Sequence, residues 1–189
     1  EVIVATKGNS EEARAHAILE AKGNILGFLC TDNLLNDKSF LRTMVWYASQ
    51  PNTAGSYTAQ YDYVRQDKAL SRYFALLGAN DPLCWWLGRS DRQSYLQTAR
   101  SGIASFSKDE RLPSIGDNGF FVKRSALSKV VIDPNSHFPM DVCEDLRQAG
   151  ELKYWVLPIK LWHRSGESFL GYFRRRYVYT RELYFKQRE

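Results

Sequence analysis

The chain has few cysteines and no long hydrophobic run, and these two absences exclude several classes of protein. Its three cysteines, Cys30, Cys84 and Cys143, form neither a CxxC pair nor a Cys/His zinc spacing. We therefore expect reduced thiols in a cytoplasmic protein, without a disulfide framework or a zinc site. No stretch of about 18 apolar residues occurs, so no membrane-spanning helix is expected in this chain. No secretory signal peptide is visible either.

The composition is that of a folded domain whose charge is unevenly spread. The chain has 189 residues, of which 44% are hydrophobic and 14% aromatic, so general disorder is excluded and a single domain over residues 1–189 is expected. The net charge is +5, and residues 164–189 hold seven Lys or Arg against three Glu. A basic tail of this kind is suited to anionic lipid, nucleic acid or a phosphorylated substrate.

Local patterns at the start of the chain predict a strand, a helix and a second strand. Residues 1–6 are a β-branched run, and Ile25–Cys30 is a second apolar run. Between them, Asn9 or Ser10 can cap a helix that Gly23 ends. These three elements within about thirty residues predict a βαβ unit with a parallel pair of strands.

The rest of the chain predicts further elements of both kinds. Helices are expected at residues 37–48, 70–77, 125–129, 141–149 and 167–186. Strands are expected at 119–123 and at 152–157, where Pro158 stops the second one. The stretch QPNTAGSYTAQ at 50–60 is rich in turn residues and is expected to be a loop.

The run GNILGFLCTDN at residues 23–33 is the most informative segment for function. Its apolar strand ends directly before Asp32 and Asn33. In open α/β sheets, ligands bind outside the carboxyl ends of the strands. A carboxylate at that position can hold a divalent metal against a phosphate, so Asp32 is the first candidate for chemistry. The alternative is an Asp that caps the turn or helix that follows.

An acidic group on a predicted helix supplies candidates for a general base. Asp141, Glu144 and Asp145 are three and four residues apart, so one helix face can hold all three. Mutual repulsion would raise the pKa of one carboxyl toward a useful range. The alternative is a solvated acidic turn that the helix dipole favours.

Three further polar residues are candidates for ligand contacts. Asp117 and Asn118 lie between Gly116 and Gly119, where a ligand can approach the backbone closely, although an ordinary turn before a strand has the same pattern. His163 follows a strand-like segment and is interpreted either as a metal or phosphate contact or as a structural residue.

Two aromatic features have both a structural and a functional interpretation. Trp85 and Trp86 can stack against a sugar or a lipid-linked acceptor, or at least one of them belongs to the core. Residues 166–189 are expected to form a C-terminal basic amphipathic helix. That helix is either a lid or oligomer contact, or a surface that lies on an anionic membrane.

Four segments in order resemble one family. ARAHAILEAKGNILGFLCTDN (13–33) is similar to the family stretch in which an Arg-containing helix and a Gly precede a strand and an acidic motif. The other three are GDNGFFVKRSAL (116–127), CEDLRQAG (143–150) and LWHRSGES (161–168). Together they resemble the GT-A fold of inverting, nucleotide-sugar-dependent glycosyltransferases of the family 2 type. The family's first strand is missing, and EVIVAT corresponds to its second strand, ending at Thr6 where the family usually has Asp.

The resemblance implies a fold and a reaction. The fold is a three-layer α/β/α sandwich around a mostly parallel twisted sheet. The reaction moves a sugar from a nucleotide-diphosphate sugar to a hydroxyl of a glycan or of a polyprenyl or other lipid-linked acceptor, in polysaccharide or glycolipid biosynthesis. It is assisted by Mg²⁺ or Mn²⁺, which neutralises the departing diphosphate. A cytoplasmic protein at the inner face of the membrane is expected.

The resemblance also implies roles for individual residues. Asp32 is the metal ligand, with His163 as a second one. The family's Asp-x-Asp motif has Cys30 at its first position, and a thiol is a poor ligand for Mg²⁺. The base is Asp145, with Asp141 and Glu144 as the other candidates. The implied donor and acceptor contacts are Asn33, Asp117 and Asn118, and Trp85 and Trp86 are added to them as candidates because their rings can stack on a sugar.

Three other functions stay open at this point. Cys30 in the metal motif suggests a catalytically impaired relative that serves as a binding or scaffold protein. The basic aromatic tail suggests a nucleic-acid module, but no RNA-binding motif is present and nucleic acid is not expected as a partner. A nucleotidyltransferase on a similar sheet would differ by a Gly-rich phosphate loop before residue 1.

Overall fold

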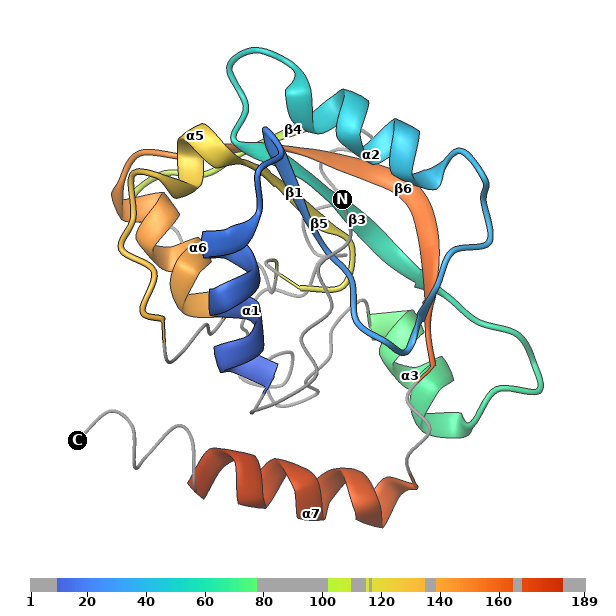
Figure 1. The fold of residues 1–189 in the computed structure, drawn as a ribbon. Helices are drawn as coiled ribbons and strands as arrows, with labels where there is room; N and C mark the ends of the chain where they lie inside the picture. The colour runs from blue at the N-terminus through green and yellow to red at the C-terminus, as the bar shows by residue number, and fades with distance from the viewer. Residues whose placement is uncertain are drawn as a thin grey trace.

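The computed structural model describes residues 10–77, 102–109, 115, 117–134, 139–164 and 168–181, and in these ranges the fold is mixed α/β (Figure 1). The helices are α1 (Ser10–Glu20), α2 (Phe40–Ser49), α3 (Ala69–Leu77), α5 (Arg124–Leu127), α6 (Pro139–Gln148) and α7 (Phe169–Tyr179). The strands are β1 (Ile25–Phe28), β2 (Asn33–Leu34), β3 (Gly55–Asp62), β4 (Gly102–Ser105), β5 (Phe120–Lys123) and β6 (Lys153–His163). The strand expected at 1–6 lies outside the described residues. None of the described helices is long and apolar enough to cross a membrane.

The six described strands form one sheet of mixed direction. Its order is β1-β5-β3-β6-β2, and β4 also pairs with β6. β5 is antiparallel to both β1 and β3, and β3 is parallel to β6, so β1, β3 and β6 run in the same direction. β2 and β4 are antiparallel to β6. The expectation of a mostly parallel sheet is therefore corrected for these strands, because β5 lies between β1 and β3, two strands that would otherwise pair in parallel.

Helices cover both faces of this sheet. One core cluster joins the sheet to α1, α5 and α6 through apolar side chains such as Ile18, Leu127 and Leu146. The other joins it to α2 and α3 through Met44 and Ala75, among others. Strand β6 contributes alternate residues to the two clusters, as expected for a strand buried on both faces. The layered arrangement expected from the sequence is thus present in the described part of the fold.

The segment predicted as a loop at 50–60 contains most of β3, a central strand of the sheet. Gly55 is required there, because a Cβ atom at this position would lie 2.1 Å from the carbonyl oxygen of Phe121 on β5. Ser56 and Thr58 are buried, and the Ser56 hydroxyl donates a hydrogen bond to the carbonyl oxygen of Met44 in α2 at 2.9 Å. The small and polar residues that suggested a turn instead permit close packing of β3 against its neighbours.

Strand β6 continues past Pro158, although a stop was predicted there. Its pairing with β4 reaches Val156, and its pairing with β2 starts at Trp162. In the described sheet, Pro158 therefore lies where β6 has a partner only on the β3 side. The register with β3 shifts between Thr58 and Gln60, opposite this part of β6. The missing N–H of Pro158 is tolerated at such a bulged position.

The predicted helices are found within a few residues of their expected ends, except that the tail helix, expected to reach residue 186, is described as an α-helix only to Tyr179, and residues 182–189 lie outside the described residues. The helix expected from Ser125 is the short α5, which begins at Arg124 after Lys123 and has no side-chain cap. The tail helix is α7, whose N-cap Ser168 accepts a hydrogen bond from the backbone N–H of Gly171 at 3.1 Å. α7 lies outside the layers that cover the sheet (Figure 1).

Candidate active site

Seven polar side chains meet at the edge of the sheet where β1 and β6 end. We call them the edge network: Arg14, Cys30, Asp32, Asn33, Asp117, Asn118 and His163. Residues 30–33 follow β1, residues 117–118 precede the antiparallel β5, and His163 ends β6. The network thus occupies the edge at which ligands bind in open α/β sheets. Five of its members, Asp32, Asn33, Asp117, Asn118 and His163, were candidates from the sequence alone.

Asp32 and His163 form an ion pair across the ends of β1 and β6. The Nε2 atom of His163 lies 3.1 Å from Oδ2 of Asp32, whose side chain remains 39% exposed. The backbone N–H of Arg164 donates to the carbonyl oxygen of Asp32 at 3.0 Å, which fixes the two chain segments together. The ring of His163 lies beside that of Tyr61, with centroids 5.4 Å apart.

The surroundings of Asp32 favour its ionised form. Partial burial acts to raise the pKa of this carboxyl, but the hydrogen bond and charge of His163 act against it. The backbone of Asp32 and the charge of Arg175 on α7 add to the effect of His163, so the pKa is lowered overall. Arg175 is thereby an electrostatic neighbour of the site that the sequence patterns did not single out.

Two asparagines join the end of β1 to the start of β5. The side-chain amide of Asn33 donates to Oδ1 of Asn118 at 2.8 Å and to Oδ1 of Asp32 at 3.3 Å. The backbone N–H of Cys30 donates to Oδ1 of Asn33 at 3.0 Å. Asn118 is buried and has a φ of 44°, and Gly119 follows at 87°. This left-handed turn directs the side chains before β5 toward β1.

Cys30 lies where the resembled family has its first metal-binding Asp, and its side chain is a protonated thiol. The Sγ atom of Cys30 donates to Oδ1 of Asp117 at 3.1 Å, and the same oxygen accepts from the backbone N–H of Asn118 at 2.9 Å. Burial and the charge of Asp117 outweigh the guanidinium of Arg14 and raise the pKa of Cys30 to about 12. Arg14 Nη2 lies 3.5 Å from Asp117 and 3.4 Å from the sulfur. In the absence of a metal, Cys30 is therefore a thiol and not a thiolate at neutral pH.

The acidic trio lies on α6, a helix that contributes none of the seven side chains of the edge network. Glu144 is paired with Arg147 one turn later on the same helix, with an Nε–Oε2 distance of 2.8 Å. Partial burial, with the charges of Asp141 and Glu144, raises the pKa of Asp145. The expected mutual effect of the three carboxylates is thus present. α6 contributes to the same core cluster as α1, the helix that carries Arg14, and both helices lie on one side of the sheet (Figure 1). Trp85 and Trp86 lie outside the described residues.

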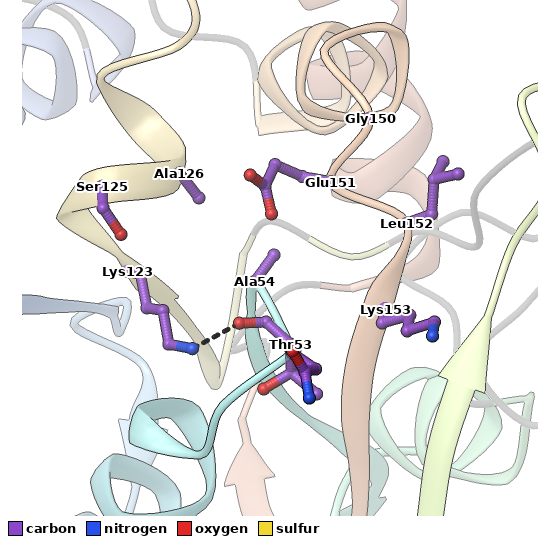
Figure 2. Close-up of a pocket in the computed structure, with 10 residues that line it drawn as sticks. Thr53, Ala54, Lys123, Ser125, Ala126, Gly150, Glu151, Leu152 and Lys153 are labelled. Atoms are coloured by element: carbon purple, nitrogen blue, oxygen red, sulfur yellow. Dashed lines mark hydrogen bonds between the residues drawn. The ribbon is translucent and has the colours of Figure 1, made fainter.

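A hollow of about 390 Å³ lies at the opposite edge of the sheet, far along the strands from the edge network. It is lined by the start of β3, the end of β5 and the start of β6 (Figure 2). Lys123 reaches from β5 to the carbonyl oxygens of Gln50 and Thr53, each at 2.6 Å. Burial lowers the pKa of Lys123, and the charge of Glu151 opposes that effect. The hydrogen bonds of Lys123 thus connect β5 to the backbone of residues 50–53.

The carboxylate and amide oxygens of the edge network fit a hard divalent cation that also binds the phosphates of a substrate. In the part of the chain that the structure describes, no three His, Cys, Asp or Glu side chains are grouped as a complete metal site. Mg²⁺, however, is commonly held by one or two carboxylates together with substrate phosphates. Asp32, ionised and partly exposed, fits that role, and the amide oxygens of Asn33 and Asn118 lie nearby.

Two members of the network were not candidates from sequence reasoning. Arg14 was noted only as part of the family stretch, and its helical position gave no sign that it reaches Asp117, 103 residues away. Cys30 was noted as a substitution in a metal motif, and its hydrogen bond to Asp117 was not expected. A charged residue on the helix face toward a strand end is the signal that would have indicated Arg14.

Comparisons of the chain with family models, with curated proteins and with solved structures found no match.

Proposed function

We propose that the chain is an inverting glycosyltransferase of the GT-A type. It would transfer a sugar from a nucleotide-diphosphate sugar to a hydroxyl of a glycan or lipid-linked acceptor. The observation that carries this proposal is the ionised, partly exposed Asp32 at the carboxyl edge of the sheet, beside His163 and Arg175. One ionised carboxylate can share a divalent cation with the phosphates of a substrate, and a nearby arginine adds positive charge for the diphosphate.

In this proposal the edge network binds the donor. Asp32, with His163 as a second ligand, would hold Mg²⁺ or Mn²⁺, and the bound ion would neutralise charge on the leaving diphosphate. Arg175 supplies fixed positive charge near the same carboxylate. Asn33, Asn118 and Asp117 supply amide and carboxylate groups for the sugar hydroxyls. The turn at Asn118 and Gly119 supports this role because it fixes their direction.

The acceptor hydroxyl must lose a proton to a carboxylate. Asp145 is the proposed base, because its raised pKa makes it a stronger base than an ordinary Asp. Asp141 and Glu144 raise that pKa by their charge, and either of them remains a candidate for the proton transfer itself. Trp85 and Trp86 are proposed to stack on donor or acceptor sugar rings.

Donor binding tests the proposal directly. Titration calorimetry of the full-length protein with UDP-, GDP- and TDP-sugars, with Mn²⁺ or Mg²⁺ present, should show saturable binding of at least one donor. The same titration with EDTA should show that binding is lost, because the diphosphate then meets Asp32 without a cation between them. Absence of binding for all three donor classes in either metal would refute the proposal.

A second candidate function is a catalytically impaired relative that acts as a binding or scaffold protein. The specific observation is the uncharged, hydrogen-bonded thiol of Cys30 at the first position of the metal motif. Donor hydrolysis by Cys30→Asp tests it, and Cys30→Asn serves as a control of similar size without charge. A rise from near zero in Cys30→Asp alone supports impairment. Robust activity of the unchanged protein excludes it.

A further inference from the structure

Helix α7 has one face fixed to the domain and another face exposed. Tyr172 is buried and packs against Phe74 of α3, with ring centroids 5.2 Å apart. On a different side of the helix, Phe169, Leu170, Phe173 and Tyr177 are 67%, 80%, 48% and 64% exposed. We call these four the apolar stripe, because positions 169, 173 and 177 follow one another at one-turn spacing and Leu170 lies beside them.

Arginines flank the apolar stripe on both sides. At 100° per residue, Arg176 lies along one border of the stripe, and Arg174 and Arg181 lie along the other. The Arg181 guanidinium stacks over the ring of Tyr177, 5.6 Å from its centroid. Residues 168–181 hold four Arg and no Asp or Glu. The exposed face of α7 therefore combines large apolar side chains with cationic borders.

This combination matches one class of partner better than its competitors. A nucleic acid would meet the arginines but would leave Phe169 and Leu170 without an apolar partner. A second copy of the helix, packed stripe to stripe, would bring two rows of arginines together, which is unfavourable. An anionic bilayer surface accepts both features, because the stripe enters the acyl boundary while the arginines extend to the phosphates.

We propose that α7 binds the surface of an anionic membrane, with its axis in the plane of the surface and the apolar stripe inserted. The helix has 11 residues and does not span the bilayer. Tyr172 and its contact with α3 would hold the rest of the domain above the lipid. This inference goes beyond the proposed transfer reaction and does not depend on it.

Vesicle sedimentation of the full-length protein tests the inference. The protein should sediment with phosphatidylcholine vesicles that contain phosphatidylglycerol, and much less with phosphatidylcholine alone, and added salt should weaken the binding. Phe169→Ser with Phe173→Ser should reduce the partition coefficient roughly tenfold or more. Arg174→Gln with Arg181→Gln should reduce it by a similar factor on anionic vesicles only.

A matched control is available on α2. Leu41 and Val45 are also exposed, at 48% and 42%, and one turn apart, so Leu41→Ser with Val45→Ser removes two exposed apolar side chains away from α7. This control should bind vesicles as the unchanged protein does. Circular dichroism should show that all variants are folded, because every substituted side chain is exposed.

Several results would overturn the inference. These are absence of sedimentation with anionic vesicles, equal sedimentation with neutral ones, or unchanged binding after both substitutions in the stripe. A dimer in ultracentrifugation that disappears in Phe169→Ser with Phe173→Ser would instead assign the stripe to a second copy. Donor binding, measured by calorimetry in the same variants, should stay unchanged, so failure at the membrane is distinguishable from failure of the proposed transferase.

Discussion

Lys123, at the edge where β5 ends, donates to two backbone carbonyls, whereas Asp32, at the opposite edge, is linked to the side chains of Asn33 and His163. Lys123 lines the hollow of about 390 Å³, and its hydrogen bonds tie the end of β5 to the segment that leads into β3. Asp32 lies beside an amide pair, a histidine and an arginine, and it stays partly exposed.

The difference between these edges illustrates why a hollow alone is weak evidence for a functional site. The ammonium group of Lys123, which lines the hollow, already donates hydrogen bonds to two backbone carbonyl oxygens. The edge network contains a carboxylate whose ionised form is favoured and which can still reach solvent. A lowered carboxyl pKa beside convergent polar groups is the stronger indication of ligand binding.

The largest effect is expected from removing the charge at the proposed site. Asp32→Asn should lower the transfer rate roughly 100- to 1,000-fold, because the diphosphate loses the group that holds its cation. Asp62→Asn is the matched control, since Asp62 ends β3 at the same edge and is only weakly paired with Lys160 at 4.0 Å. Initial rates with saturating donor provide the measurement. Equal losses in both variants would remove Asp32 from its assigned role.

The turn that positions Asn118 should be the most sensitive backbone position of the edge network. A Cβ atom at Gly119 would lie 2.6 Å from Leu161 and 2.9 Å from Thr58, in addition to the cost of its φ of 87°. Gly119→Ala should therefore lower the free energy of unfolding by about 3 kcal/mol. Gly150 has a similar φ of 88° and open space around it, so Gly150→Ala should cost only about 1 kcal/mol. Urea denaturation gives the loss in free energy of unfolding for each variant, and the difference between the two losses measures the steric cost at Gly119. Equal losses would contradict the close packing of Gly119 against Leu161 and Thr58.

The opposite edge should affect stability without affecting transfer. Lys123→Met leaves the carbonyl oxygens of Gln50 and Thr53 without the ammonium donor. The free energy of unfolding should fall by about 1–2 kcal/mol. The rate per folded molecule should stay within about twofold. A large fall in that rate would instead make the hollow part of the active site.

The smallest effect is expected in the pH dependence of stability. The pKa of Asp32 is lower in the folded protein, so its contribution is fully present above the unfolded value of about 4. That contribution is lost as the pH falls through the lower folded pKa. It should be under about 1 kcal/mol, because the side chain is 39% exposed. Urea denaturation at pH 6 and pH 3 gives the free energy of unfolding of the unchanged protein and of Asp32→Asn. The difference between the two proteins should be smaller at pH 3. A larger difference at pH 3 would mean that the pKa of Asp32 is raised and not lowered.

Much of the fold follows from local patterns, and the exceptions have physical causes. Helices with an apolar stripe, such as α2 and α6, were predicted close to their observed ends. β3 was missed because Gly55, Ser56 and Thr58 resemble turn residues locally, while their small size is required by neighbours distant in sequence. Pro158 is a second exception. From one sequence, a proline inside a strand cannot be distinguished from a proline that ends the strand, because the pairing of the neighbouring strands is not known.

The site could be predicted residue by residue but not as a network. Chemistry at the end of a strand identified Asp32 and Asn33, and glycine neighbours identified Asp117 and Asn118. The hydrogen bond between the two asparagines depends on the antiparallel placement of β5 beside β1, which the sequence did not predict. The family resemblance placed Cys30 at the first position of a metal motif, where a thiol is a poor ligand, but it did not predict the hydrogen bond from Cys30 to Asp117.

The contact between Arg14 and Asp117 joins positions 103 residues apart. Closing so long a stretch of chain has an entropic cost that only the completed domain offsets. A chain in which β5 is not in place would therefore lack the contacts of Arg14, Cys30 and Asn33 with Asp117 and Asn118. Ligand binding at this edge would then depend on the insertion of β5 as well as on the residues that follow β1.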